Sequence, residues 1–199
     1  MAYARIALYT VRPGTLDGIL TKAEAELVPQ MRQQPGFRRN FTVRTGADTL
    51  VAVTVWDDEA RAKQADEHLS AWARTEMGPS LVTFDNHMGE LVISSVPTGE
   101  ISGYARVALW RFQPGTADSV AERVRNEMLP QMEREPGFVG YGAARTGSDS
   151  AISVSVSASR EQSRAAAERI APWLSDQLGA SIASVERHEG EIVWGVRAS

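Results

Sequence analysis

The sequence repeats itself at an offset of 101 residues, and this repeat constrains the fold more than any other feature. Three matched pairs show it: "PQMRQQPGF" at 29–37 with "PQMEREPGF" at 130–138, "YARIAL" at 3–8 with "YARVAL" at 104–109, and "HMGELV" at 87–92 with "HEGEIV" at 188–193. A solenoid needs about three or more repeats, so two copies predict two domain-sized units of about 100 residues. The predicted boundaries are 1–94 for the first repeat, 95–103 for a linker and 104–199 for the second repeat.

Composition and missing motifs exclude several classes of protein. The net charge of −4 argues against nucleic-acid binding, which normally requires a basic stripe. The chain has no cysteine, so thiol nucleophiles, disulfides and cysteine metal sites are excluded. The three histidines have no metal-ligand spacing, and no phosphate-binding glycine loop follows a strand. We therefore expect no metal and no cofactor. Neither a signal peptide nor a membrane-spanning run is recognisable, so we expect a cytoplasmic protein without a membrane partner.

Each copy has the same order of predicted elements. In the first copy, segments in which apolar and polar residues alternate, or which are rich in β-branched and aromatic residues, predict strands. Apolar residues at helical spacing predict helices. Pro29 lies inside the first helix and lacks a backbone N–H, so we expect a kink there. The predicted elements are a strand at 3–11, a helix from Leu16 to Pro35, strands at 37–44 and 49–56, a helix at 58–76 and a strand at 81–94.

The order β-α-β-β-α-β is that of a ferredoxin-like unit. Its two helices cover one face of an antiparallel sheet and leave the other face bare. Two copies on one chain would solve this burial problem by packing their sheets into one intramolecular barrel. We therefore predict an α+β protein whose minimal unit is a monomer with pseudo-twofold symmetry, while a further homodimer stays open.

The "PGF" motif, the hairpin, a strand that ends in Trp56 and the acidic helix start "DDEA" resemble the antibiotic biosynthesis monooxygenase family. The resemblance implies the dimeric α+β barrel fold, here as a fused tandem pair. It also implies a cofactor-independent oxidoreductase that acts on an aromatic, polyketide-type phenol with dioxygen. In such an enzyme the substrate loses a proton and its anion passes an electron to dioxygen. The protein supplies a dry aromatic pocket, a proton acceptor and stabilisation of the anion.

The family's strand tryptophan follows an asparagine placed four residues earlier in anthrone-type members. Here Ala52 precedes Trp56, and the second copy has Ser153 and Ser157 at these positions. Because neither copy keeps the pair, two alternatives stay open. One is a non-catalytic small-molecule-binding protein of the same fold. The other is a haem-binding or haem-degrading barrel, for which His87 would be the ligand.

The third strands of the two copies differ on one face only. One face carries valine or isoleucine at every second position in both copies. The other face carries Ala52, Thr54 and Trp56 in the first copy and three serines in the second copy. We therefore expect two unlike clefts, with the aromatic cleft and most of the function in the first copy.

Six residues are candidates for the site. We predict catalytic roles for Trp56, as an aromatic wall and N–H donor, and for His87, as a proton acceptor. The candidates for substrate binding are Tyr9, Asn40, Trp72 and Tyr141. Structural roles remain alternatives, since Trp72 and His87 both have an identical residue in the second copy. Arg5 and its counterpart Arg106 could hold an oxyanion if they point inward.

Overall fold

The computed structural model describes residues 1–96, 99 and 101–198, and the first repeat has the expected order of elements. Thr15 precedes the first helix and Asp58 caps the second, where its carboxylate accepts a hydrogen bond from the backbone N–H of Arg61. The elements are β1 (Tyr3–Val11), α1 (Leu16–Lys22), α2 (Val28–Gln33), β2 (Phe37–Arg44), β3 (Thr49–Trp56), α3 (Glu59–Trp72) and β4 (Leu81–Ser95).

The second repeat has the same order, and the Ser159 hydroxyl caps its last helix. Its elements are β5 (Tyr104–Phe112), α4 (Ala117–Arg123), α5 (Leu129–Met132), β6 (Phe138–Gly147), β7 (Ser150–Ser157), α6 (Arg160–Leu178) and β8 (Ile182–Arg197). A short 3₁₀ helix, Gly179–Ser181, joins α6 to β8.

The eight strands form one closed barrel in the hydrogen-bonded order β1-β3-β2-β8-β5-β7-β6-β4. The fold is thus α+β, with two ferredoxin-like repeats contributing to one antiparallel barrel, as predicted. Closure leaves no strand of the barrel with an unpaired edge.

The chain divides into two compact units that differ slightly from the repeats. The first unit contains Met1–Glu90 and the end of β8 from Ile192 onward. The second unit contains Ser102–Glu191 and the end of β4 from Leu91 onward. The predicted linker at 95–103 falls partly on residues 97, 98 and 100, which lie outside the described residues.

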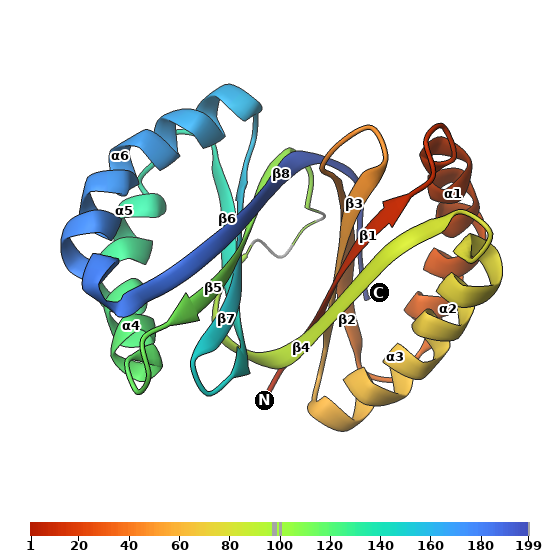
Figure 1. The fold of residues 1–199 in the computed structure, drawn as a ribbon, viewed down its shortest axis with the longest axis horizontal. Coiled ribbons are helices and arrows are strands. Elements are labelled where there is room, and N and C mark those ends of the chain that lie inside the picture. The colour runs from red at the N-terminus through yellow and green to blue at the C-terminus, as the bar shows by residue number, and fades with distance from the viewer. Residues whose placement is uncertain (97–98, 100, 199) are drawn as a thin grey trace. The chain divides into compact units, whose positions relative to one another are not determined.

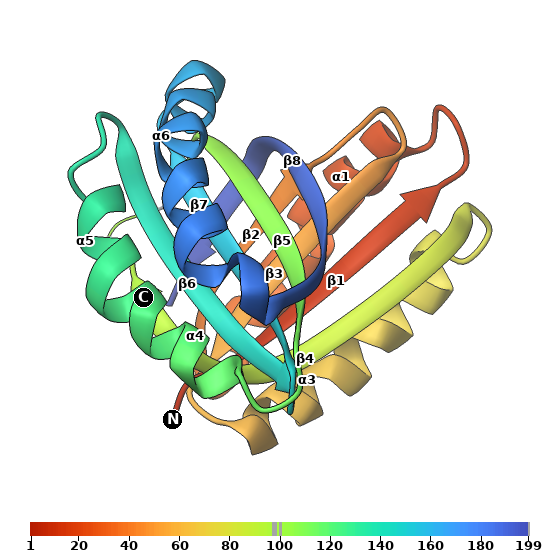
Figure 2. The same cartoon turned by 60° about the vertical axis from the view of Figure 1, so that its left-hand side comes forward.

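In each unit the helices cover one face of the strands (Figures 1 and 2). In the first unit α1, α2 and α3 lie on one side of β1, β2 and β3. In the second unit α4, α5 and α6 lie in the same way on β5, β6 and β7. Side chains at alternate strand positions therefore point either toward the helices or to the opposite face.

The helix irregularity expected at Pro29 takes the form of a π-helical turn. Ala23–Leu27 adopt this turn between α1 and α2, and Pro29 lies in the first turn of α2. Val124–Met128 do the same before Pro130. Proline cannot donate to the carbonyl four residues before it, and in both repeats the hydrogen-bonding pattern changes just before the proline. A third π-helical turn, Ala73–Met77, follows α3.

No helix within the described ranges is both long and apolar enough to cross a lipid bilayer.

Candidate functional site

In the first unit, a polar network fills the space between the sheet and α3. Arg5 on β1 is only 1% exposed, and its Nε donates to Oδ1 of Asp66 on α3 at 2.5 Å. Asp66 Oδ1 also accepts from Ser70 Oγ at 3.0 Å and from Asn86 Nδ2 at 2.9 Å. Burial alone would raise the pKa of Asp66, but the hydrogen bond and charge of Arg5 outweigh it and hold this pKa below its ordinary value.

Aromatic side chains fill the rest of this region. Trp56 is fully buried and lies edge-on to Phe37, with 5.4 Å between ring centroids. Trp194, from the end of β8, donates its indole N–H to Asn40 Oδ1 at 3.0 Å. Asn40 Nδ2 in turn donates to the carbonyl of Val53 at 3.0 Å, so both ends of this amide are bound to the protein itself.

A small cavity of about 50 Å³ lies between the helices and sheet of the first unit. Three of the predicted substrate-binding residues, Tyr9, Asn40 and Trp72, line it together. Tyr9 stacks on Phe84 with 5.1 Å between centroids. The indole N–H of Trp72 meets no acceptor among the described residues. A volume of this size holds water rather than an aromatic ligand.

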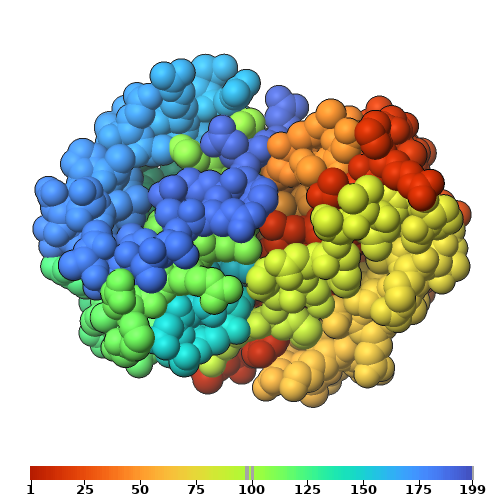
Figure 3. Space-filling view, in the orientation of Figure 1, coloured from red at the N-terminus to blue at the C-terminus, as the bar shows by residue number. Residues whose placement is uncertain are grey.

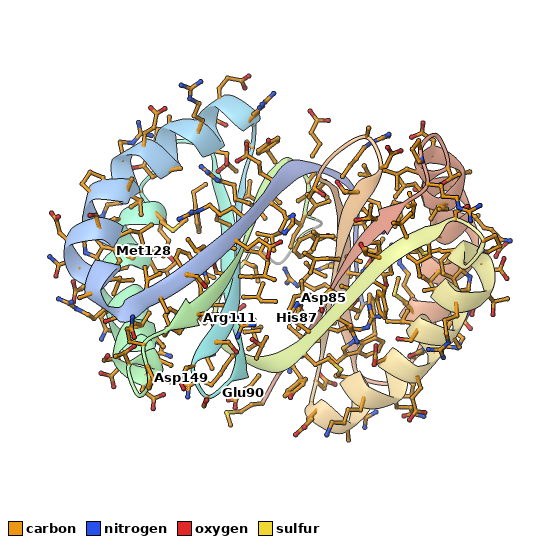
Figure 4. All side chains as sticks on the ribbon, in the orientation of Figure 1. Asp85, His87, Glu90, Arg111, Met128 and Asp149 are labelled. Atoms are coloured by element: carbon orange, nitrogen blue, oxygen red, sulfur yellow. The ribbon has the colours of Figure 1, made fainter. Side chains whose placement is uncertain are left out.

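The second unit holds a much larger cavity of about 450 Å³ at the equivalent place. We call it the serine-lined cavity, because Ser153, Ser155 and Ser157 of β7 form much of its floor. Apolar side chains of the helices form its roof, including Met128, which Figure 4 labels on the helix side of this sheet. Two cavities of different size agree with the expectation of two unlike clefts, but the larger one lies in the second unit.

Replacements by smaller side chains contribute to the larger volume. At many lining positions, the repeat offset aligns a bulky or polar residue of the first unit with a smaller residue of the second. These replacements include Trp56 by Ser157, Asp66 by Ala167, Ser70 by Ala171, Trp194 by Ile93 and Leu20 by Ala121. In the first unit the protein's own side chains occupy the space that the second unit leaves open.

The floor of the serine-lined cavity offers hydrogen-bond donors. Trp110 Nε1 donates to Ser153 Oγ at 2.8 Å, and a hydrogen bond also links Ser153 with Tyr141. Burial raises the pKa of Tyr141 to about 12, and the contact with Ser153 offsets this only in part. The phenol therefore stays protonated at neutral pH. Since one hydrogen bond between two hydroxyls uses one O–H, the other O–H remains free for a ligand.

Three arginines also line this cavity, and two of them are held by carboxylates. Arg106 Nε pairs with Glu189 at 3.3 Å, and Arg145 pairs with Asp118. The third, Arg187 on β8, lies with its guanidinium carbon 5.7 Å from the centroid of the Trp110 ring. Figure 3 shows the start of β8 beside α6 at the surface of this unit. Arg187 is itself exposed and lines the cavity, so it lies on the solvent side of the cavity.

The lining residues include no aspartate, glutamate or histidine. This statement covers the described part of the chain, which contains all three histidines. The cavity therefore combines an apolar roof, hydroxyl and indole groups and positive charge. Such a site suits a flat apolar molecule with acceptor atoms or negative charge.

The two residues predicted to be catalytic line neither cavity. Trp56 packs into the core of the first unit, and its indole N–H has no acceptor within the described residues. His87 pairs with Ile6, which pairs with Val53, so it lies on the sheet face opposite the helices. Its Nε2 contacts Asp85 at 2.9 Å, and Figure 4 shows both side chains on the side of β4 away from α3. Their catalytic roles remain predictions.

Of the six candidate site residues, only Tyr141 lines the serine-lined cavity, at 7% exposure. Arg106, which we expected to hold an oxyanion if it pointed inward, also lines it. The sequence interpretation missed Arg187 and Ile93. A signal for both was present, because the repeat offset aligns Arg187 with Asn86 and Ile93 with Trp194. What the sequence did not reveal is that these positions face the helices of the second unit.

Within the described residues, no group of three or more metal-ligating side chains comes together. The expected absence of a metal or cofactor remains a prediction.

Comparison with known proteins supports the fold over the whole chain. A putative monooxygenase from Fusobacterium nucleatum has a TM-score of 0.81 at 12% identity, covering 98% of this chain and 94% of that chain. A second protein with this description, from Lactobacillus acidophilus NCFM, has a TM-score of 0.77 at 11% identity, covering 100% and 96%. An anthrone oxidase-like protein has a TM-score of 0.72 at 13% identity, covering 100% and 94%. At such low identity these likenesses concern the fold alone.

No protein of curated function matches the sequence. Residues 2–75, however, match the family model "Antibiotic biosynthesis monooxygenase". This segment contains β1, β2, β3 and α3, including the "PGF" motif, Trp56 and "DDEA" that carry the resemblance. The match confirms the resemblance for the first repeat, since residues 2–75 are similar to the antibiotic biosynthesis monooxygenase family.

Proposed function

We propose that this protein is a cofactor-independent, monooxygenase-like enzyme whose serine-lined cavity binds an electron-rich aromatic small molecule of the polyketide-phenol type. The observation that carries the proposal is the 450 Å³ volume between an apolar roof and a donor-lined floor. Pockets for small molecules usually measure about 300–1,000 Å³ and combine apolar walls with a few placed polar groups. The family that the first repeat resembles supports monooxygenase-like chemistry.

The cavity favours the ionised form of such a substrate. Arg106 and Arg187 lie beside it, and Tyr141 and Ser153 present hydroxyl groups. These groups stabilise a phenolate or enolate and thereby lower the pKa of the bound substrate. Because no carboxylate or imidazole lines the described part of the cavity, the proton passes to water at its mouth.

The reaction needs no external reductant. A methylene group between two aromatic rings can follow the balanced equation R₂CH₂ + O₂ → R₂C=O + H₂O. The substrate anion gives its electrons to dioxygen, one oxygen atom stays in the new carbonyl group, and the other leaves as water. The role of the protein is to exclude bulk water and to hold the anion.

Two alternatives have specific tests. Binding without catalysis is favoured by the lack of a carboxylate or histidine in the described lining of the cavity. The haem alternative named His87 as the axial ligand, and neither His87 nor another histidine lines either cavity. We therefore expect titration with haemin to produce no shifted Soret band and dialysed protein to be colourless.

Oxygen uptake tests the proposed function directly. Dialysed protein with a chelator is mixed with anthrone-type phenols, and dioxygen consumption and product are measured together. We expect one dioxygen consumed per ketone formed. The Ser157→Trp variant, which restores the tryptophan of the first repeat, should fill the cavity and abolish turnover while the Tm stays unchanged. Saturable binding without oxygen uptake would establish the non-catalytic alternative, and full activity of Ser157→Trp would refute the cavity as the site.

A further inference from the structure

The net charge of four equivalent positions differs between the small cavity of the first unit and the serine-lined cavity of the second, and this difference indicates the charge of the ligand. In the first unit, the carboxylate of Asp66 satisfies the guanidinium of Arg5 and the amide of Asn86. Met88, which is uncharged, pairs with Arg5 across the sheet and is the fourth position that we compare, after Arg5, Asp66 and Asn86. The four positions together carry no net charge, and the anion that Arg5 requires is built into the chain.

In the second unit that anion is missing. Ala167 stands where Asp66 does, and Arg187 stands where Asn86 does. Arg106 has a different partner, Glu189, whose side chain is 46% exposed. The four equivalent positions therefore carry a net charge of +1, around a cavity instead of a filled core.

Arg187 is the residue whose charge lacks compensation. It is exposed and forms no ion pair among the described residues, and its guanidinium lies over the face of Trp110. Stacking on an indole fixes the guanidinium and leaves its N–H groups free at the cavity. A guanidinium presents these donors in a fork that matches a carboxylate.

We propose that the ligand of the serine-lined cavity is an aromatic acid, and that its carboxylate takes the place that the Asp66 side chain holds in the first unit. This inference rests on the proposed function, since it specifies the substrate class of the same cavity. The aromatic body lies under the helices, and the acidic group lies beside Ala167 with Arg106 and Arg187 as its partners. The substrate thus completes an interaction that the other repeat makes internally.

Two fluorescent probes with one skeleton test the charge separately from the cavity. N-phenyl-1-naphthylamine is neutral, and 8-anilinonaphthalene-1-sulfonate adds one anionic group to it. The readout is the ratio of their affinities for each folded variant, because steric effects on the shared skeleton cancel in this ratio. Arg187→Gln should weaken the anionic probe about tenfold, which is the loss of roughly one charge-assisted contact, and change the neutral probe less than about twofold.

Ala167→Asp is the sharper variant, because it restores the carboxylate of the first unit. It should lower the affinity ratio of anionic to neutral probe by about tenfold or more, through repulsion and through capture of the two arginines. Ala167→Asn is the matched control of equal size, and its ratio should stay within about twofold of the wild-type value.

The outcomes separate the two claims. If neither probe binds the wild type, or if Ser157→Trp leaves binding of both unchanged, the cavity is not the binding site and the proposed function fails. If both probes bind, Ser157→Trp removes them, and Ala167→Asp lowers the ratio no more than Ala167→Asn does, the cavity stands and the aromatic-acid proposal is overturned.

Discussion

At the residue scale, a buried ion pair occupies in the first unit the space that the second unit leaves open. The Arg5 side chain is 2% exposed and that of Asp66 is 25% exposed. Burial alone would lower the pKa of Arg5, but Tyr9 and Asp66 outweigh it and raise this pKa. Removing the carboxylate would leave a buried cation without its main partner, which is more costly than the pair is stabilising.

Asp66→Ala should therefore lower the free energy of unfolding by about 3 kcal/mol, as removal of one member of a buried pair does. The control is Glu168→Ala, which breaks the exposed pair of Arg164 and Glu168 on α6 and should lower this free energy by less than about 1 kcal/mol. Urea unfolding measures both. Equal losses in the two variants would show that the buried pair has no special role.

The same carboxylate predicts a pH dependence. The folded-state pKa of Asp66 is lowered, so its contribution to stability is complete above the unfolded-state pKa of about 3.9. This contribution is lost as the pH falls through the folded-state pKa. Asp66→Asn should accordingly show a smaller loss of stability between pH 5 and pH 2 (on the order of one titrating group) than the wild type. Parallel pH profiles of the two proteins would contradict this.

The residue scale also shows what sequence could predict. Tyr141 was selected because its side chain could orient a phenolic ligand by hydrogen bonding or stacking, and Trp56 was selected because the other repeat lacks a tryptophan there. The two repeats do differ at this position, but the sequence did not determine which of them has the cavity. A tryptophan provides a wall for a ligand only where space adjoins it, and Trp56 is fully enclosed by Phe37 and the helices. Its loss in the second repeat is part of what opens the cavity.

At the element scale, β4 and β8 contribute to both units. Each is much longer than the other strands, with 15 and 16 residues. The sequence predicted the existence and the bounds of β4, because alternation and turn signals are local. It did not reveal that Trp194 packs against Asn40, because this contact spans 154 positions of the chain.

Gly195 tests the placement of the end of β8. A Cβ at Gly195 would lie 2.1 Å from the backbone oxygen of Ile101, which cannot move aside as a flexible side chain would. Gly195→Ala should therefore lower the Tm by several degrees, on the order of the 1–3 kcal/mol cost of overpacking. Gly179→Ala is the control, since a Cβ there meets nothing within 4 Å. A Tm of Gly195→Ala equal to that of the control would refute the placement.

At the scale of the whole molecule, each unit includes the end of a strand that belongs to the other repeat. The first unit requires the end of β8, where Trp194 donates to Asn40 and the backbone N–H of Ala198 donates to the carbonyl of Arg38 at 2.8 Å. A fragment of residues 1–97 lacks these partners and leaves β2 with an open edge. It should dimerise or aggregate in light scattering, whereas a stable monomer with native-like helix and strand content would contradict the account.

The fold was predictable because the repeat, the order of elements and the burial of one sheet face all follow from local patterns. The location of the cavity was not, because it depends on the summed volume of side chains from five strands and the helices. Several replacements, none decisive alone, turn a filled core into a cavity, and they include Ser157, Ala167, Ala171 and Ile93.

The central claim is that the second unit binds the ligand and the first does not. The most direct test is an equilibrium titration of N-phenyl-1-naphthylamine into the wild type and two cavity-filling variants. Ser157→Trp fills the serine-lined cavity, and Ala52→Leu fills the small cavity of the first unit. We predict one site per chain in the wild type and in Ala52→Leu, and no binding by Ser157→Trp with its Tm unchanged. Binding that persists in Ser157→Trp and disappears in Ala52→Leu would contradict the account.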